Sequence, residues 1–363
     1  MDINIILEPD VTPQQFAEIA VEAERIGART IWSSNYHFQT DAFLALSLAS
    51  QTTSKIKLGV LAVSPWEMHP LKMANAILTL NEMSKGRAIV AVSGGGGLLG
   101  AIGWHAWDGA PVWPGYHPVK KTSEPDRRVA AVAETIDILK LARSGKFNMQ
   151  YEGRVFSIRR PWGMVWAEHE GPELYSCSSG PMMIRMGARV ADSIQLSDFT
   201  VSQMPGVMEN VEKGFAKREE PTDDFRIGNF WAWHIKKDLD ASMHEARREL
   251  IWRGAIIGQI EDEIMPFLHD EEELKIVMDN WENIRIAFRN RSGVIEGIPD
   301  DIINRLIAGM ASAGDLSAID EEVERYRKLG EAGLTELDLR LFDDPMDGLK
   351  LIGEHVLPAV RDV

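Results

Sequence analysis

Short apolar segments alternate with amphipathic helical segments along most of this chain. The first helical stretch opens with Thr12-Pro13-Gln14-Gln15, a helix-start signature, and continues with apolar residues at helical spacing up to Gly27. The segments that we predict as strands are 3–7, 30–34, 56–63, 87–93, 173–177, 192–196, 226–234 and 334–341. Strands joined by helices pair in parallel, because only a crossover returns the chain in the same direction. The pattern therefore predicts an α/β fold, a (β/α)8 TIM barrel.

Two long segments interrupt this alternation, one after the fourth strand and one after the seventh. Residues 94–124 are rich in Gly, Pro and Trp, and a loop of that length in a compact fold is usually a lid or a binding loop. Residues 239–330 are mainly helical in pattern and acidic, which is typical of a solvated face. A shorter insert at 147–158 resembles a hairpin with its turn at Glu152-Gly153. We expect one domain over 1–363, with an active-site loop at 94–124 and a helical insertion at 239–330.

The composition disfavours several classes of function. The formal net charge of −16 argues against nucleic acid and anionic membranes as partners, and no apolar run approaches the roughly 20 residues that span a bilayer. The N-terminus lacks a basic segment followed by an apolar stretch, and Cys177 is the only cysteine, so we expect a reducing cytoplasm. The histidines lack metal-ligand spacing, and no Gly-x-Ser-x-Gly elbow is present. These features favour a protein that acts on small molecules and binds no metal.

The carboxyl ends of the predicted strands carry most of the candidate chemistry, since ligands bind at that face of parallel barrels. His37 follows the second strand, where its imidazole could donate or accept a proton near neutral pH; the alternative is a structural histidine in a loop. Glu8 follows the first strand, where a carboxylate could bind substrate. Gly94 to Gly97 follow the fourth strand and either let backbone approach a ligand closely or form a hinge for the next loop.

Further candidates follow the later strands and lie in the loops. Ser178-Ser179-Gly180-Pro181 opens a helix, where free N–H groups favour an anion such as a cofactor phosphate; the alternative is helix capping by serine. His69 before Pro70 either caps a helix or donates to a pocket. An aromatic pocket for a flat or apolar substrate could be formed by Trp66, Trp104, Trp107 and Trp231. Trp231 lies within a strand, where packing of the barrel is the usual role.

Seven further segments stand in a defined order along the chain: DAFLALSLASQTTSKIKLG, HP, TLNEMSKGR, YSCSSGP, ADSIQLSD, GLTELDLRL and GEHVLPAVR. Together they resemble the bacterial luciferase-like superfamily, whose members are barrels that use FMN or the deazaflavin coenzyme F420. The resemblance covers nearly the whole chain. GPMMIRMGARVAD is most similar to the F420-using branch, which includes methylenetetrahydromethanopterin reductases and F420-dependent sugar-phosphate dehydrogenases.

This resemblance implies an oxidoreductase that passes a hydride between the deazaflavin ring of F420 and a carbonyl, hydroxyl or methylene carbon, with His37 as the catalytic residue. It also implies a homodimer and a non-prolyl cis peptide, for which Ala62-Val63 is the candidate. The residues that it places at the cofactor are Tyr36, Ala62, Val63, Ser64, Ser93, Gly94, Gly95, Gly96, Ser178, Ser179, Gly180 and Pro181. The alternatives are an FMN-dependent monooxygenase that uses O2 and a non-catalytic flavin-binding barrel.

The chain departs from the family pattern at three places. Tyr36 stands where the family commonly has the Asp of an Asp-His pair. The acidic residue that related enzymes often carry in the Gly-rich turn is missing from Gly94 to Gly97. The usual Ala-Asp-Gly is Ala191-Asp192-Ser193. The first departure removes the family's usual Asp contact to the cofactor, and the second removes a candidate proton donor.

Overall fold

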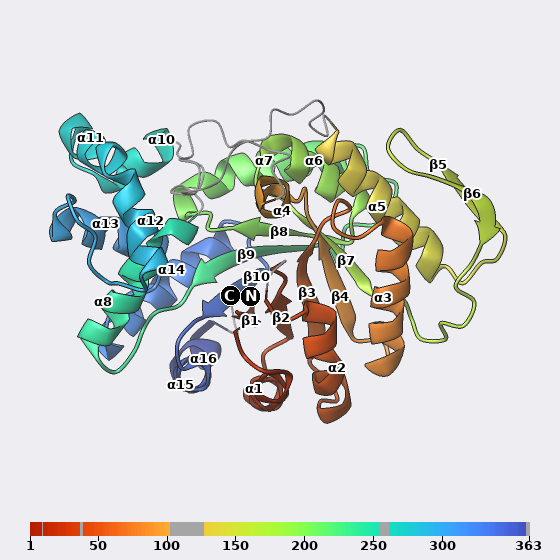
Figure 1. The fold of residues 1–363 in the computed structure, drawn as a ribbon, viewed down its shortest axis with the longest axis horizontal. Coiled ribbons are helices and arrows are strands. Elements are labelled where there is room, and N and C mark those ends of the chain that lie inside the picture. Colours follow the sequence, from red (N-terminus) through yellow and green to blue (C-terminus); the bar gives the residue numbers. More distant parts are fainter. Residues whose placement is uncertain (9, 37–38, 102–126, 254–260, 361–363) are drawn as a thin grey trace.

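Eight parallel strands close into a barrel in the computed structural model, which describes residues 1–8, 10–36, 39–101, 127–253 and 261–360 (Figure 1). The barrel strands are β1 (Asp2–Leu7), β2 (Thr30–Ser34), β3 (Lys57–Val63), β4 (Ala88–Val92), β7 (Glu173–Cys177), β8 (Ser193–Ser197), β9 (Arg226–Ala232) and β10 (Glu336–Leu341). Their order around the barrel is β1-β10-β9-β8-β7-β4-β3-β2. The predicted α/β TIM-barrel fold is confirmed.

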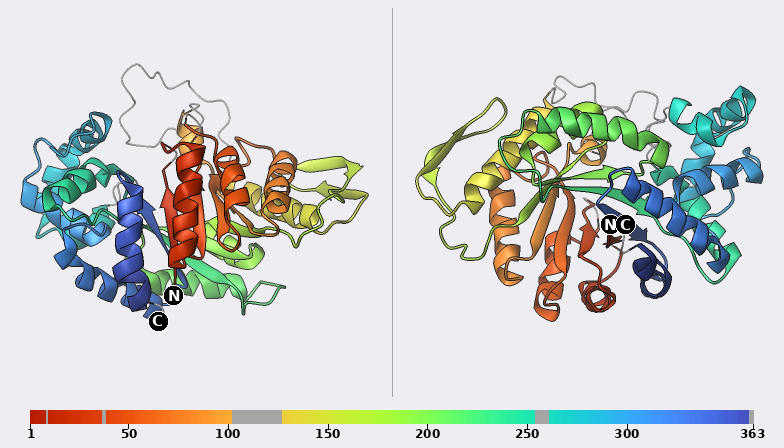
Figure 2. Two further views of the ribbon diagram at one scale, coloured as in Figure 1. Left: turned by 90° about the horizontal axis from the view of Figure 1, so that it is seen from below. Right: turned by 180° about the vertical axis from the view of Figure 1, so that it is seen from behind.

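Helices surround the barrel (Figures 1 and 2). Their apolar side chains pack in one core with those of the strands. The helices are α1 (Pro13–Ile26), α2 (Ala42–Thr52), α3 (Pro70–Met83), α5 (Arg128–Arg143), α6 (Pro181–Val190), α7 (Met204–Phe215), α14 (Ile319–Glu331), α15 (Pro345–Leu351) and α16 (Leu357–Val360). Helix α1 begins as the sequence predicts, because Thr12 and Gln15 form a reciprocal capping box. It ends at Gly27, whose φ of 92° is left-handed.

The helical insertion lies between β9 and β10, on the opposite side of the barrel from a projecting hairpin (Figure 1). Its helices are α8 (Leu239–Arg248), α10 (Glu261–Ile264), α11 (Glu271–Asp279), α12 (Trp281–Arg289) and α13 (Asp300–Met310). They enclose an apolar core of their own, which includes Leu250, Ile284 and Leu306. Helix α14, by contrast, packs against the main core through Val323, Tyr326 and Leu329. The insertion therefore ends before α14 rather than at residue 330.

Three other predicted boundaries differ from the structure. The strand predicted to reach residue 234 ends at Ala232, and Trp233 forms only an isolated bridge with Ser312. The hairpin consists of β5 (Met149–Glu152) and β6 (Ser157–Trp162), so its turn covers 153–156, closed by a hydrogen bond from Gly153 N to Phe156 O (2.8 Å). The predicted loop at 94–124 contains a short helix, α4 (Gly96–Ala101), and its residues 102–124 lie outside the described residues.

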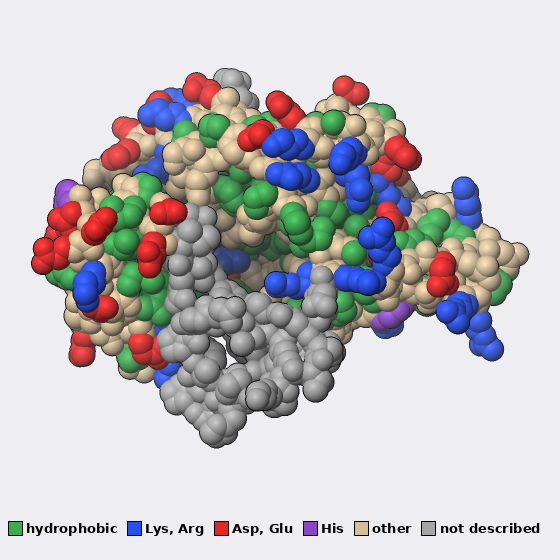
Figure 3. Space-filling view, turned by 90° about the horizontal axis from the view of Figure 1, so that it is seen from above, with side chains coloured by type: hydrophobic (Ala, Val, Ile, Leu, Met, Phe, Trp, Pro, Cys, Tyr) green, Lys and Arg blue, Asp and Glu red, His purple; other side chains and the backbone are tan. Residues whose placement is uncertain are grey.

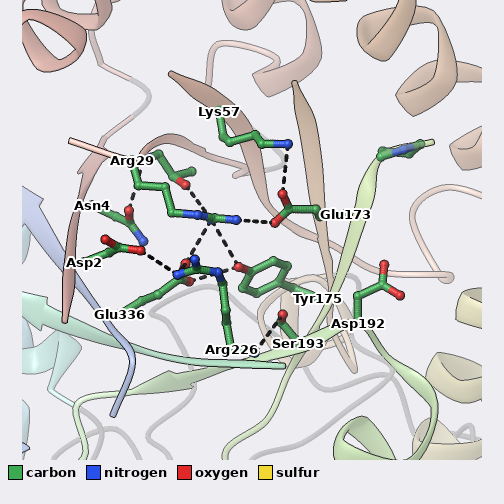
Figure 4. Close-up of polar contacts among 12 residues, drawn as sticks. Asp2, Asn4, Arg29, Lys57, Glu173, Tyr175, Asp192, Ser193, Arg226 and Glu336 are labelled. Carbon is green, nitrogen blue, oxygen red and sulfur yellow. Dashed lines mark hydrogen bonds and ion pairs between the residues drawn. The ribbon is translucent and has the colours of Figure 1, made fainter. Parts of the chain in front are cut away.

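The amino end of the barrel is closed by a network of charged side chains, shown in Figure 4. Arg29 contacts Glu173 (2.7 Å) and Glu336 (2.9 Å), and Arg226 contacts Asp2 (2.6 Å) and Glu336 (3.1 Å). Glu336 is fully buried, and burial raises its pKa although both arginines oppose the shift. Charge pairs at this face of a barrel serve stability, because substrates enter from the other end.

One step further into the barrel, Asp338 holds the interior together. It accepts hydrogen bonds from Asn4 Nδ2 (2.9 Å), Trp32 Nε1 (2.7 Å) and Gln195 Nε2 (2.8 Å). Trp32 packs its ring edge-on against Tyr175 at 5.5 Å, and its indole fills the space above Gly59. These contacts join β1, β2, β3, β7, β8 and β10, so they fix the strand arrangement that positions the opposite rim.

Candidate active site

The carboxyl ends of β2, β3, β4 and β7 form one continuous part of the barrel rim. These four strands are parallel and adjacent in the order β2-β3-β4-β7. Tyr36, Val63, Gly95 and Gly180 follow or end these strands in turn. The spatial arrangement that the sequence predicts for these four residues is therefore confirmed.

The end of β3 is irregular, as predicted, but one bond earlier than expected. The non-prolyl cis peptide joins Leu61 to Ala62 and not Ala62 to Val63. The pairing register with β4 shifts between Leu61 and Val63, so the backbone leaves regular strand geometry before Ala62. Asn35 holds this bend from β2, because its N–H donates to Leu61 O (2.6 Å) and its Nδ2 donates to Ala62 O (3.0 Å).

The turn after β4 lies directly against the end of β3. Gly95 has a φ of +74°, and a Cβ built there would lie 2.8 Å from both Cβ and Oγ of Ser64 and 2.9 Å from Cδ1 of Trp66. Ser93 Oγ accepts a hydrogen bond from Gly95 N (3.3 Å) and so supports the turn. A Cβ at Gly96, by contrast, would meet no described atom within 4 Å. Ser64, Trp66, Ser93 and Gly95 are thus brought together, as the sequence predicts, and Gly96 borders open space.

The four residues predicted to contact a phosphate at the start of helix α6 differ in exposure: one is buried and three are exposed. Ser178 is fully buried, and its hydroxyl lies within hydrogen-bond distance of two acceptors, Ser176 O (3.2 Å) and Met183 O (3.3 Å). Ser178 therefore supports the strand-to-helix turn. Ser179, Gly180 and Pro181 are exposed, and a Cβ at Gly180 would meet no described atom within 4 Å. These three residues leave the helix N-terminus accessible to an anion, and their predicted phosphate contact stays a prediction.

On the other side of β2, a group of charged and aromatic side chains fills the rim. We call Glu8, Ser34, Tyr36, Asp198, Glu249, Arg253 and Arg340 the mouth cluster. Glu8 Oε1 lies 3.2 Å from Arg340 Nε and accepts from Ser34 Oγ (3.4 Å). Burial raises the pKa of Glu8, and the nearby Glu249 raises it further, although Arg340 opposes the shift. Burial, helped by the charge of Glu8, also raises the pKa of Tyr36 to about 12.

Two arginines, the buried Arg253 and the partly buried Arg340, complete the mouth cluster. The guanidinium of Arg340 lies over the ring of Phe230 at 5.2 Å, and that of Arg253 lies over Phe342 at 5.9 Å. Arg253 also pairs with Asp198 at 3.2 Å, and burial lowers the pKa of Arg253. Its Nε has no hydrogen-bond acceptor among the described residues. The cluster can therefore donate hydrogen bonds to a ligand and balance negative charge that develops on it.

Glu8 and Tyr36 are predicted from the sequence as site residues, whereas Asp198, Glu249, Arg253 and Arg340 are not. One signal for Arg340 was present, because Glu336, Asp338 and Arg340 alternate with leucines along β10. Alternation on a barrel strand sends one set of side chains inward, where charges need partners. Asp198 directly follows β8, just as the predicted candidate Glu8 directly follows β1. Glu249 and Arg253 come from the helical insertion, and no local pattern connects them to the rim.

The structure gives two residues predicted as substrate contacts packing and capping roles instead, and three predicted residues lie outside the described residues. Trp231 is 1% exposed, and its Nε1 donates to Ser312 Oγ (2.8 Å), so it packs outward against the helices, as expected of an aromatic residue in a strand. His69 caps α3 through Nδ1, which accepts from Leu71 N (3.2 Å), and its ring packs edge-on against Phe156. The residues without a described position are His37, Trp104 and Trp107.

Comparison with known proteins agrees with this geometry. A family model described as "Luciferase-like monooxygenase" matches residues 4–332. The chain belongs to this family. Its members are flavin- or deazaflavin-dependent oxidoreductases, which fits a parallel barrel whose strand ends form one continuous rim.

Relatives of known activity align over almost the full chain. A 5,10-methylenetetrahydromethanopterin reductase of Archaeoglobus fulgidus is 22% identical over 99% of this chain and 100% of its own length. An F420-dependent glucose-6-phosphate dehydrogenase of Nakamurella multipartita is 24% identical over 96% of this chain and 93% of its own. Among solved structures, the coenzyme F420 dependent tetrahydromethanopterin reductase from Methanopyrus kandleri superposes with a TM-score of 0.74 at 20% identity, covering 98% of each chain.

No helix within the described residues is long and apolar enough to cross a membrane. No group of three His, Cys, Asp or Glu side chains in that part of the chain could hold a metal ion.

Proposed function

We propose that this protein is an F420-dependent oxidoreductase that transfers a hydride between the deazaflavin and a small organic substrate such as a carbonyl compound or an alcohol. The observation that carries the proposal is the recurrence of F420 dependence in the names of similar proteins that span nearly the whole chain. The identities of 20–24% leave the substrate open.

The residues at the rim fit a flat ring with an anionic side chain. The turn at Gly95 brings backbone against Ser64 with no room for a side chain, and Gly96 and Gly180 border open space. The exposed start of α6 supplies free N–H groups for a phosphate. Tyr36 and the backbone at Ala62 and Val63 would lie against the ring. When bound, F420 would supply the hydride chemistry.

The chain's own residues would handle charge and protons. His37 would donate a proton to the oxygen of a carbonyl substrate as it is reduced, or accept one from an alcohol in the reverse direction. Arg340 and Arg253 would offset negative charge near the substrate, while Glu8 would bind or orient it. Trp66 would border the ligand through its edge beside Gly95. We also expect a homodimer, on the basis of the family resemblance.

An FMN-dependent monooxygenase is the second candidate, and the description of the matching family favours it. A non-catalytic flavin-binding barrel is the third candidate, because the acid expected after β4 is missing. The first two candidates differ in their use of oxygen, since reduced FMN activates O2 whereas F420 reacts with it very slowly.

The test is turnover under anaerobic conditions. A panel of alcohols and carbonyl compounds is added to the protein with F420, and the absorbance of the deazaflavin is followed. Substrate-dependent bleaching without oxygen supports the proposal. Oxygen uptake with reduced FMN supports the monooxygenase, and cofactor binding without any turnover supports the non-catalytic barrel. His37→Ala should abolish turnover and leave cofactor affinity within about twofold, since a proton-transfer group contributes mainly to the chemical step.

A further inference from the structure

The helical insertion meets the mouth cluster at residues 249–253. Leu250 is 1% exposed and belongs to the apolar core of the insertion. Arg253 is 2% exposed and pairs with Asp198 after β8 at 3.2 Å. The backbone N–H of Arg253 donates to Leu250 O (3.1 Å), which closes a turn of 3-10 helix around Trp252. Trp252 is therefore held in a fixed place, between the insertion core on one side and the mouth cluster on the other.

Trp252 is the middle member of a row of three aromatic rings. Its ring centroid lies 6.2 Å from that of Tyr36, which follows β2, and 5.1 Å from that of Phe288 on α12. The first pair is tilted by 44° and the second is edge-on at 89°, so neither neighbour stacks flat on the indole. The row runs from the barrel rim into the insertion, and it leaves indole surface for another ring.

These three aromatic side chains do not build the apolar cores of the molecule. All three are partly buried, and none is among the described side chains that form or pack against the cores of the barrel and of the insertion. A large ring that serves packing is normally buried in such a core, as Trp231 is at 1% exposure. A row of rings that stays outside the cores, beside the charged mouth cluster, is instead typical of a binding surface.

The outer surface of the insertion has a different character. Seven of the thirteen residues at 261–273 are Asp or Glu, and none is Lys or Arg. Figure 3 shows acidic side chains over the insertion, at the end of the molecule away from the hairpin. A surface of this kind faces water. The aromatic row on the mouth side of the same insertion therefore calls for a different partner, one that is itself apolar.

We propose that Trp252, together with Tyr36, forms one wall of the substrate site and selects substrates that carry a flat aromatic or conjugated ring. This inference rests on the proposed function, because it names the substrate class of the same rim. A flat ring would stack on the indole surface that Tyr36 and Phe288 leave uncovered. Because Leu250 and Arg253 fix the segment on both sides, binding would not have to order the indole first. Trp252 is thus a specificity-determining residue that takes no part in hydride or proton transfer.

Two ketones of similar size test this wall: acetophenone, which has a flat phenyl ring, and cyclohexyl methyl ketone, whose saturated ring cannot stack flat. Their dissociation constants are measured by NMR titration of the full chain with oxidised F420, which has no hydride to transfer. We expect acetophenone to bind about tenfold more tightly, a difference of about 1.4 kcal/mol. Trp252→Leu should reduce this ratio to within about twofold, whereas Trp252→Phe should retain most of it, since only phenylalanine keeps a ring to stack on. Trp166→Leu, the same change at a residue that is 44% exposed beyond β6, should leave the ratio unchanged.

A second measurement, turnover of both ketones with reduced F420, separates this inference from the proposed function. A ring preference in binding that Trp252→Leu removes supports the aromatic wall, and a lack of turnover would then count against the proposed function alone. Equal affinity for the two ketones, no binding of acetophenone, or a preference that Trp252→Leu retains overturns the wall even where turnover is observed. Trp252→Met repeats the comparison if the leucine variant does not fold, because methionine fills similar space without a ring.

Discussion

Replacing Gly95 with alanine tests the close approach of the turn after β4 to the end of β3. The φ of +74° at Gly95 costs an alanine about 1 kcal/mol or slightly more, because a Cβ clashes with the following carbonyl in this region. Its Cβ would also meet Ser64 at 2.8 Å and Trp66 at 2.9 Å. Overlap of this kind typically costs about 1–3 kcal/mol when neighbours must shift.

These two contributions together predict that Gly95→Ala lowers the free energy of unfolding by about 2–4 kcal/mol. A protein of ordinary stability, about 5–15 kcal/mol, still folds after such a loss. The measurement is urea-induced unfolding of the wild type and the variant, monitored by tryptophan fluorescence, together with a cofactor titration. We expect weaker cofactor binding as well, because Ser64 and the Gly95 backbone lie at the proposed ring site.

Gly96→Ala is the matched control. Residue 96 lies in α4, its added Cβ meets no described atom within 4 Å, and alanine is a better helix former than glycine by about 1 kcal/mol. Its free energy of unfolding should therefore stay within about 1 kcal/mol of the wild type. Equal stability of Gly95→Ala and Gly96→Ala would refute the reasoning, since it would mean that the turn does not press against β3.

Three further predictions concern the barrel walls and interior. Trp231→Phe should lower the free energy of unfolding by about 1–2 kcal/mol, because the indole donates to the buried Ser312, and should leave cofactor affinity unchanged. A loss of substrate binding without loss of stability would instead support a role for Trp231 in the substrate pocket. Gly59→Ala should destabilise by about 3 kcal/mol or more in thermal unfolding, because its Cβ would lie 2.1 Å from the buried Trp32 ring; an unchanged melting temperature would contradict this packing. Burial lowers the pKa of His234 from 6.5 to about 4. As the pH falls from about 6.5 to about 4, the unfolded chain therefore binds a proton at this histidine that the folded chain does not, and the free energy of unfolding falls by up to about 3 kcal/mol. His234→Asn, which keeps a donor toward Glu245, should flatten this part of the pH profile of unfolding, and an unaltered slope would show that other groups cause it.

The sequence was sufficient for the barrel because its period-2 strands and capped helices are local signals. Thr12 and Gln15 form the predicted capping box, and the strand ends predicted to meet do meet. The position of the cis peptide depends on how β3 registers with β4, which no local pattern determines. Arg253 and Glu249 reach the rim from the helical insertion, far from Glu8 and Asp198 in the sequence. Such sites arise from tertiary packing, so only the structure reveals them.

The preference of the protein for one redox cofactor tests the central claim most directly. Quenching of intrinsic tryptophan fluorescence is measured during parallel titrations with F420 and FMN under the same buffer conditions. We predict that F420 binds at least about tenfold more tightly than FMN, a difference of about 1.4 kcal/mol. Tighter binding of FMN, or retention of FMN during purification, would contradict the account.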